Sequence, residues 1–110
     1  MINVLITGHR GYLGSELKKM LLENKNIKVV GYDNSLYQKN SKHTIISDFR
    51  DIDFSTLGKI HAVVHLAGIS TNYDPPERIY YDLAMKINYE ETVKLAIKAK
   101  NARVHKFIFA

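Results

Sequence analysis

Residues 4–22 read VLITGHRGYLGSELKKMLL, and three glycines separate an apolar run from an amphipathic run. The β-branched apolar run over 2–7 predicts a fully buried strand. Leucines and Met20 then recur at helical spacing from Gly11 to about Asn24, with lysines on the other side, which predicts a helix. The glycines therefore fall where a strand hands over to a helix.

Each glycine has a physical reason at such a junction. Gly8 supplies a turn conformation that a Cβ would obstruct. Gly11 lets the backbone approach a pyrophosphate, and Gly14 lets the helix pack closely on the sheet. The helix beginning here presents free N–H groups and the positive end of its dipole to phosphates. Asp33 lies nineteen residues beyond Gly14, near the ~20 expected of a carboxylate that binds adenosine ribose hydroxyls. The pattern predicts a dinucleotide site.

The rest of the chain alternates strand-like and helical segments. A short helical or turn piece is expected over 51–59, a loop with two prolines over 70–80, and a long helix from about Tyr81 to Lys100, whose apolar face holds Leu83, Ile87, Val93, Leu95, Ala96, Ile97 and Ala99. Further strands are expected at 27–32, 43–47, 61–67 and 104–110. This alternation predicts an α/β fold, a Rossmann-like doubly wound parallel sheet with strand order 3-2-1-4-5.

Composition narrows the function classes. The 110 residues fit a single small domain, 45% apolar and 25% charged. No apolar run approaches the roughly 20 residues of a membrane span, and no signal peptide is recognisable, so we expect no membrane partner. The formal charge of +5 favours anionic partners, but the lysines are scattered, so a nucleic-acid partner is not expected. With no cysteine, thiolate metal sites and disulfides are excluded, and a cytoplasmic location fits.

Several segments together resemble the extended short-chain dehydrogenase/reductases of the NAD-dependent epimerase/dehydratase family. TGHRGYLG is similar to that family's TGxxGxxG loop, and GYDN (31–34) to the end of its second strand. SDFRD (47–51) resembles its GDIRD segment, and HAVVHLAGIS (61–70) its VVHLAA segment. INYEET (87–92) resembles its NxxGT motif. The resemblance covers essentially the whole chain.

The resemblance implies a set of cofactor-binding residues. The pyrophosphate would contact the glycine loop, at Gly8, Gly11, Tyr12, Leu13 and Gly14, and the adenosine ribose would contact the end of the second strand, at Asp33 and Asn34. The adenine would lie beside the residues after the third strand, Asp48 and Phe49. The middle of the cofactor would lie along the end of the fourth strand, at Leu66, Ala67 and Gly68, and Asn88 would fix the loops at the strand ends.

Arg10 bears on which cofactor is bound. An arginine in the glycine loop can meet a 2′-phosphate, as in NADP-using relatives such as the GDP-fucose synthases. Asp33 would repel that phosphate, so NAD is expected rather than NADP.

The family's proton-transfer chemistry needs a Tyr and a Lys four residues later, because the lysine charge lowers the tyrosine pKa. None of the seven tyrosines has that lysine. We therefore expect residues 1–110 to be the N-terminal part of a larger enzyme, with no catalytic residue, inactive alone and homodimeric when intact. The full enzyme would move a hydride to and from a carbon of a nucleotide sugar. The alternatives are a non-catalytic NAD(P)-binding sensor or scaffold module and, more weakly, a nucleic-acid binder.

The histidines give no metal pattern. His61 and His65 lie on one expected strand and face the same side, where ordinary packing is the expected role and no metal site is expected. The last strand should have an unpaired edge and an exposed apolar face, which predicts self-association or marginal stability.

Overall fold

The computed structural model describes residues 1–33, 44–46, 49–68, 82 and 85–110. Asn34 and Asp48, both expected site residues, lie outside the described residues, as do Leu83 and the loop expected over 70–80.

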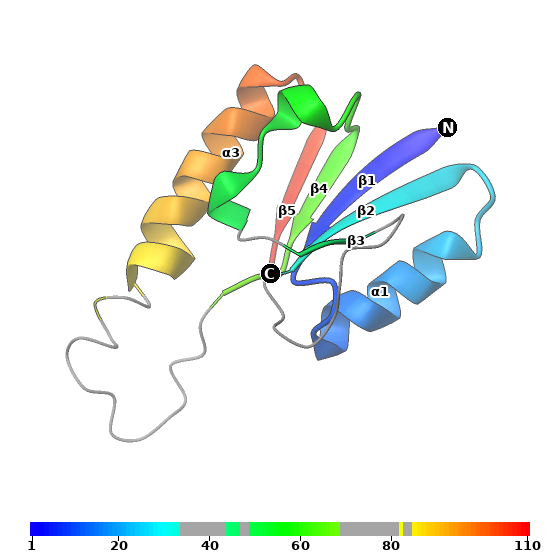
Figure 1. Ribbon diagram of the computed structural model, residues 1–110, viewed down its shortest axis with the longest axis horizontal. Helices are drawn as coiled ribbons and strands as arrows, with labels where there is room; N and C mark the ends of the chain where they lie inside the picture. Colours follow the sequence, from blue (N-terminus) through cyan, green and yellow to red (C-terminus); the bar gives the residue numbers. More distant parts are fainter. Residues whose placement is uncertain (34–43, 47–48, 69–81, 83–84) are drawn as a thin grey trace.

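The core of the chain is a five-stranded sheet in which every neighbouring pair is parallel (Figure 1). Its order is β3-β2-β1-β4-β5, which confirms the predicted doubly wound topology. The strands are β1 (Ile2–Thr7), β2 (Ile27–Asp33), β3 (Thr44–Ile46), β4 (Ala62–His65) and β5 (Lys106–Phe109). Because all five strands run in the same direction, the residues that follow them lie together at the carboxyl ends of the strands.

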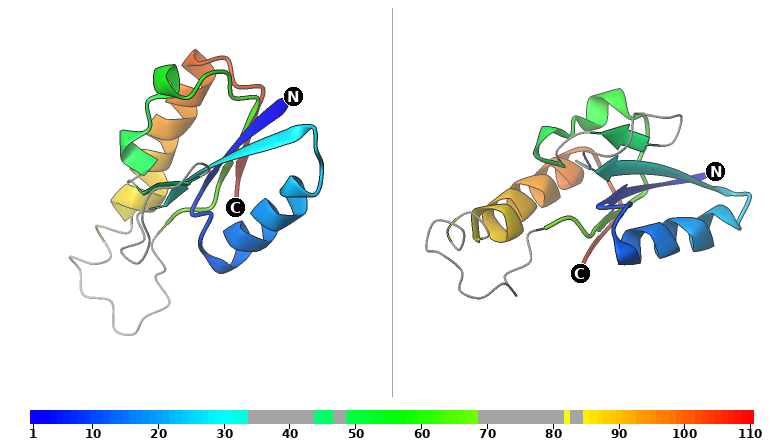
Figure 2. Two further views of the ribbon diagram at one scale, coloured as in Figure 1. Left: turned by 45° about the vertical axis from the view of Figure 1, so that its right-hand side comes forward. Right: turned by 60° about the horizontal axis from the view of Figure 1, so that its bottom comes forward.

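Helices cover the two faces of this sheet. Helix α1 (Tyr12–Leu22) lies on one face and helix α3 (Glu91–Asn101) on the other (Figure 2). A π-helical turn, η3 (Lys86–Glu90), leads directly into α3. Two short 3₁₀ turns, η1 (Phe49–Asp51) and η2 (Phe54–Thr56), occupy the region where a helical or turn piece was expected.

Side chains of the central strands alternate between two apolar clusters, as burial on both faces requires. In β1, Leu5 joins the cluster that contains Leu95 and Ala99 of α3. Val4 and Ile6 join the opposite cluster, against which Leu17 and Leu21 of α1 pack. The sheet is thus held between two separate apolar layers.

The helices bury narrower stripes than the sequence predicts. Val93 and Ile97 were expected on the apolar face of the long helix, but they are exposed, and among the described residues of that helix only Ile87, Leu95 and Ala99 are buried. On α1, Met20 and Leu22 are exposed as well. Each helix meets the sheet along one line, so apolar residues beside that line stay in solvent.

One boundary differs from expectation. β4 ends at His65 rather than residue 67, and the Leu66 and Ala67 amides donate to the Thr7 hydroxyl. The helix expected from about Tyr81 is helical at Asp82 and from Met85 onward, with a π-helical turn over Lys86–Glu90, while residues 81, 83 and 84 lie outside the described residues.

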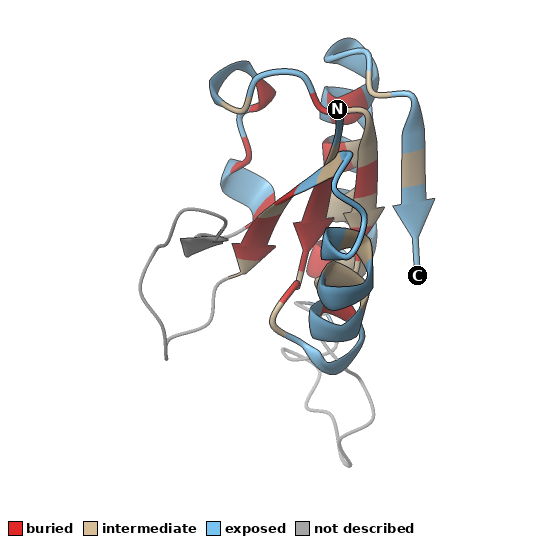
Figure 3. Cartoon of the chain, turned by 90° about the vertical axis from the view of Figure 1, so that its right-hand side faces the viewer, coloured by how far each residue is buried: buried red, intermediate tan, exposed pale blue. Residues whose placement is uncertain are grey.

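β5 forms an edge of the sheet, and its residues are mostly exposed (Figure 3). Ile108 and Phe109 are 49% and 59% exposed, so the expected exposed apolar surface at this strand is present. Among the helices that the structure describes, none has the length and apolar character needed to cross a membrane.

Candidate functional site

The loop between β1 and α1 turns at Gly8, whose φ of +70° is one that side-chain-bearing residues rarely adopt. Its N–H donates to the carbonyl of Tyr32 in β2 at 2.8 Å. A Cβ here would stand 2.9 Å from the Ala67 amide nitrogen, after β4. Gly8 therefore lets the ends of β1, β2 and β4 close on one another.

The other two glycines shape the start of α1. Gly11 is its N-cap residue, with an allowed φ of −70°, and its N–H donates to the Gly8 carbonyl at 3.1 Å. A Cβ on Gly14 would fall 2.6 Å from His9 Cα and closer still to the Gly8 carbonyl oxygen. Gly14 thus brings α1 against the loop itself, whereas the expected close approach was to the sheet.

Asp33 faces this loop from the end of β2. The backbone N–H of Arg10 donates to its Oδ2 at 3.1 Å. The N-cap residue of α1, Gly11, has no side chain to cap the helix, and the first turn of α1 carries no acidic residue. The positive end of the α1 dipole and the Asp33 carboxylate therefore border the same loop, which favours a ligand with both phosphate and hydroxyl groups.

The residues after β4 are fixed by Thr7. Its Oγ1 accepts hydrogen bonds from the N–H groups of Leu66 and Ala67, each at 3.1 Å. Further along, a Cβ on Gly68 would stand 2.8 Å from Oδ1 of Asn88 in the π-helical turn. Asn88 is thus brought to the strand end that it was expected to support.

The remaining expected site residues are placed differently. Tyr12 and Leu13 are 87% and 63% exposed on the first turn of α1, beside the glycine loop. Phe49 is buried in the α3-side cluster, with its ring edge-on to His65 at 4.6 Å between centroids. Its side chain belongs to the core, so a contact with adenine would have to come from its backbone.

The sequence motifs did not identify His9 and Gly31, which lie against each other beside the loop. His9 is 2% exposed, and a Cβ on Gly31 would fall 2.6 Å from its Nδ1. Burial lowers the pKa of His9, opposed by its hydrogen bond with the Tyr32 backbone. A glycine inside an apolar strand was the available signal, because it often marks close approach of another group.

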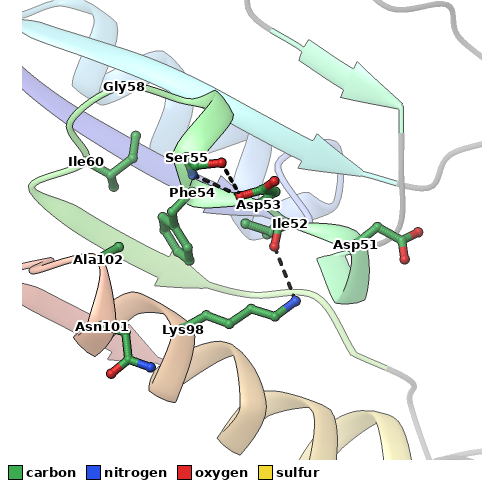
Figure 4. Close-up of a pocket in the computed structure, with 10 residues that line it drawn as sticks. All are labelled: Asp51, Ile52, Asp53, Phe54, Ser55, Gly58, Ile60, Lys98, Asn101 and Ala102. Atoms are coloured by element: carbon green, nitrogen blue, oxygen red, sulfur yellow. Dashed lines mark hydrogen bonds between the residues drawn. The ribbon is translucent and has the colours of Figure 1, made fainter.

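A groove of about 690 Å³ lies elsewhere, between the two 3₁₀ turns and the C-terminal end of α3 (Figure 4). Lys98 reaches across it and donates from Nζ to the carbonyls of Arg50 and Ile52 at 3.0 and 3.2 Å. The groove includes Ile60, which precedes β4, so it lies toward the opposite end of the strands from the glycine loop. It is separate from the candidate site.

Within the described ranges, no group of three or more His, Asp or Glu side chains is arranged to hold a metal ion. His65, instead, is packed among Phe49, Phe107 and Phe109.

The strand order and the glycine loop define the chain as a Rossmann-like doubly wound α/β protein. The family model described as the NAD dependent epimerase/dehydratase family matches residues 4–110, so the chain belongs to that family. No curated protein matches the sequence significantly.

Solved epimerase structures share this fold. UDP-glucuronic acid 4-epimerase from Bacillus cereus, in complex with UDP-glucuronic acid and NAD, is 27% identical with a TM-score of 0.82 over 98% of this chain and 39% of its own. UDP-N-acetylglucosamine 4-epimerase from Methanobrevibacter ruminantium, in complex with UDP-N-acetylmuramic acid, is 29% identical with a TM-score of 0.77 over 98% and 37%. The chain thus spans about two-fifths of the length of these structures.

Proposed function

We propose that this chain binds NAD across the ends of β1, β2 and β4, as the cofactor-binding part of a nucleotide-sugar epimerase or dehydratase. The observation that carries the proposal is the bare-backbone cradle at Gly8, Gly11 and Gly14, bordered by Asp33. A Cβ at Gly8 or Gly14 would collide with neighbouring backbone atoms, so the loop keeps this shape only with glycine at both positions, and the residues present fit a closely approaching pyrophosphate.

The proposed roles follow from placement. Backbone N–H groups at the start of α1 would hold the pyrophosphate, with Tyr12 and Leu13 beside it. Asp33, with Asn34 next to it in sequence, would hold the adenosine ribose, and Asp48 with the backbone of Phe49 would border the adenine. Leu66, Ala67 and Gly68 would line the middle of the cofactor, and Asn88 would support Gly68.

The NAD complexes of the similar epimerases support this cofactor. Bound nicotinamide would supply the hydride chemistry. The sequence holds no Tyr followed four positions later by Lys, so we propose that these 110 residues contribute the cofactor site and not the proton transfer. The substrate of the whole protein would be a nucleotide sugar, as in the UDP-sugar complexes of the similar structures.

Calorimetric titration with NAD and with NADP tests the proposal. We expect NAD to bind more tightly, because the Asp33 carboxylate can accept ribose hydroxyls but repels a 2′-phosphate. Asp33→Ala should weaken NAD binding about tenfold or more, the effect of losing a charged hydrogen bond. It should leave NADP binding unchanged or improved.

Asp51→Ala is the matched control, because Asp51 is an exposed acid that lines the separate groove. This variant should bind NAD like the wild type. Unchanged NAD affinity in Asp33→Ala would count against the assigned role of Asp33, and a wild type that binds neither nucleotide would overturn the proposal.

A further inference from the structure

His65 connects the glycine loop to α3 through two threonine hydroxyls. Its Nδ1 lies 2.6 Å from Thr7 Oγ1, and its Nε2 lies 2.9 Å from Thr92 Oγ1 in the first turns of α3. Both His65 and Thr7 are fully buried. The ring therefore sits between the segment that ends β1 and the helix that follows the π-helical turn.

The hydrogen-bond inventory of Thr7 fixes the direction of this chain of bonds. A hydroxyl has one proton to donate and two lone pairs. The lone pairs of Thr7 Oγ1 accept from the N–H groups of Leu66 and Ala67, which can only donate, and the Leu66 N–H is shared with the Thr7 carbonyl oxygen at 3.2 Å. The Thr7 hydroxyl must then donate its hydrogen bond to His65 Nδ1, so Nδ1 is the acceptor and carries no proton. The ring proton consequently lies on Nε2, and this N–H donates a hydrogen bond to the Thr92 hydroxyl oxygen.

The surroundings of the ring keep it in this neutral form. Phe49 stands edge-on at 4.6 Å between centroids, and Phe109 is stacked at 5.9 Å. Burial lowers the pKa of His65 to about 4. A proton on Nδ1 would remove the acceptor for the Thr7 hydroxyl and leave three donors competing for one oxygen.

We propose that His65 is a positioning residue for nucleotide binding. Because His65 accepts a hydrogen bond from the Thr7 hydroxyl, both lone pairs of Thr7 Oγ1 point toward the Leu66 and Ala67 amides. These bonds position the backbone of residues 66 and 67 beside Gly8. This inference rests on the proposed function, because it concerns the same site. The consequence is steric. Gly8 and Ala67 are so close that a shift of the 66–67 backbone must reshape the glycine loop.

Two variants of His65 test its hydrogen bonds to Thr7 and to Thr92 individually. In His65→Asn, the amide oxygen can replace the Nδ1 acceptor, while the link to Thr92 is lost. In His65→Gln, a polar group can reach Thr92, while the acceptor for Thr7 is lost. We expect His65→Asn to bind NAD within about twofold of the wild type and His65→Gln to bind about tenfold more weakly, the effect of one lost buried hydrogen bond.

His61→Asn is the matched control. His61 precedes the same strand, and its Nδ1 also accepts a hydrogen bond, from the Asn3 N–H at 3.0 Å, but at the other end of β4. It should bind NAD like the wild type. Thr7→Ser and Thr7→Val give a second pair that leaves the imidazole in place, and only Thr7→Val should weaken binding.

The tautomer is measured directly by nitrogen-detected NMR of the wild-type chain. The expected result is an unprotonated Nδ1 and a protonated Nε2 at neutral pH, and a protonated Nδ1 would overturn the inference. A wild type that binds NAD while His65→Gln and Thr7→Val bind equally well would overturn it too, with the proposed function intact. A wild type that binds no NAD would overturn the proposed function and the inference with it.

Discussion

At the scale of single residues, Gly14 is the most constrained position of the loop. Its missing Cβ leaves room for the Gly8 carbonyl and His9 Cα, which are backbone atoms and cannot rotate away. Gly11 differs, because among the described residues a Cβ there would meet only the Gly8 oxygen, at 3.3 Å. Two glycines of one motif therefore carry different steric demands.

We predict that Gly14→Ala lowers the free energy of unfolding by about 2–3 kcal/mol, because the added methyl forces α1 away from the loop. Gly11→Ala should change stability by less than about 1 kcal/mol, because its φ of −70° suits any residue. Chemical denaturation of both variants checks this. Equal losses of stability would show that the close approach at Gly14 is not the cause.

Sequence reasoning found some residues of the candidate site and missed others for a physical reason. Asp33 was found because its spacing from the glycines follows the length of one strand–helix–strand unit. Thr7, His65 and Thr92 were missed as a group, because their hydrogen bonds join two parallel strands and a helix far apart in the sequence. Only the fold brings these residues together.

At the scale of elements, α3 ends in a hydrogen-bonded turn that places Arg103 in a left-handed conformation with φ of 61°. The Val104 N–H donates to the Ala99 carbonyl, and the Arg103 N–H to the Lys100 carbonyl, each at 3.0 Å. This is the Schellman arrangement, in which glycine is the usual residue at the left-handed position. An arginine there leaves the turn strained.

We predict that Arg103→Gly stabilises the chain by about 0.5–1 kcal/mol, because relief of the left-handed strain exceeds the added freedom of the unfolded chain. Arg103→Ala, which removes the same charge but keeps a Cβ, is the control and should give no gain. The midpoint of thermal or chemical unfolding measures both. A gain of equal size in the alanine variant would trace the effect to charge instead.

The sequence predicts the positions of the strands more accurately than the burial of the helices. β1 and β2 were located almost to the residue, because apolar β-branched runs buried on both faces have no other stable placement. The width of the buried stripes on α1 and α3 could not be read, because it depends on where each helix axis crosses the sheet. The π-helical turn at Lys86–Glu90 could not be predicted, because it has no simple sequence period.

At the scale of the whole molecule, the buried imidazoles couple folding to pH. Burial lowers the pKa of His65 from 6.5 to about 4 in the folded chain. As pH falls below about 6.5, His65 is protonated in the unfolded chain but stays neutral in the folded chain, so the free energy of unfolding decreases. The loss continues until the pH reaches the folded pKa, near 4.

We therefore predict that the free energy of unfolding falls by about 3 kcal/mol through His65 alone between pH 7 and pH 4. His9 acts in the same direction, since burial lowers its pKa as well. The difference between wild type and His65→Asn isolates the His65 part, and urea unfolding at several pH values measures it. Parallel pH profiles of the two proteins would contradict the assigned burial of a neutral His65.

The exposed edge strand has a consequence for solution behaviour. Ile108 and Phe109 present apolar surface on β5, beside backbone groups that no described strand pairs. We predict concentration-dependent self-association by sedimentation velocity, reduced in Ile108→Lys. Val93→Lys, an equally exposed apolar position on α3, should leave association unchanged. A wild type that stays monomeric across a wide range of concentrations would refute this prediction.

The central claim is that the β1–α1 loop cradles the pyrophosphate of a dinucleotide, and amide NMR of the chain during an NAD titration tests it most directly. The claim predicts that the largest shift changes fall on the amides of residues 8–14, with Asp33 and Ala67 following at the same NAD concentration. Changes centred instead on Asp53, Gly58 and Asn101, which line the separate groove, or no saturable changes at all, would contradict it.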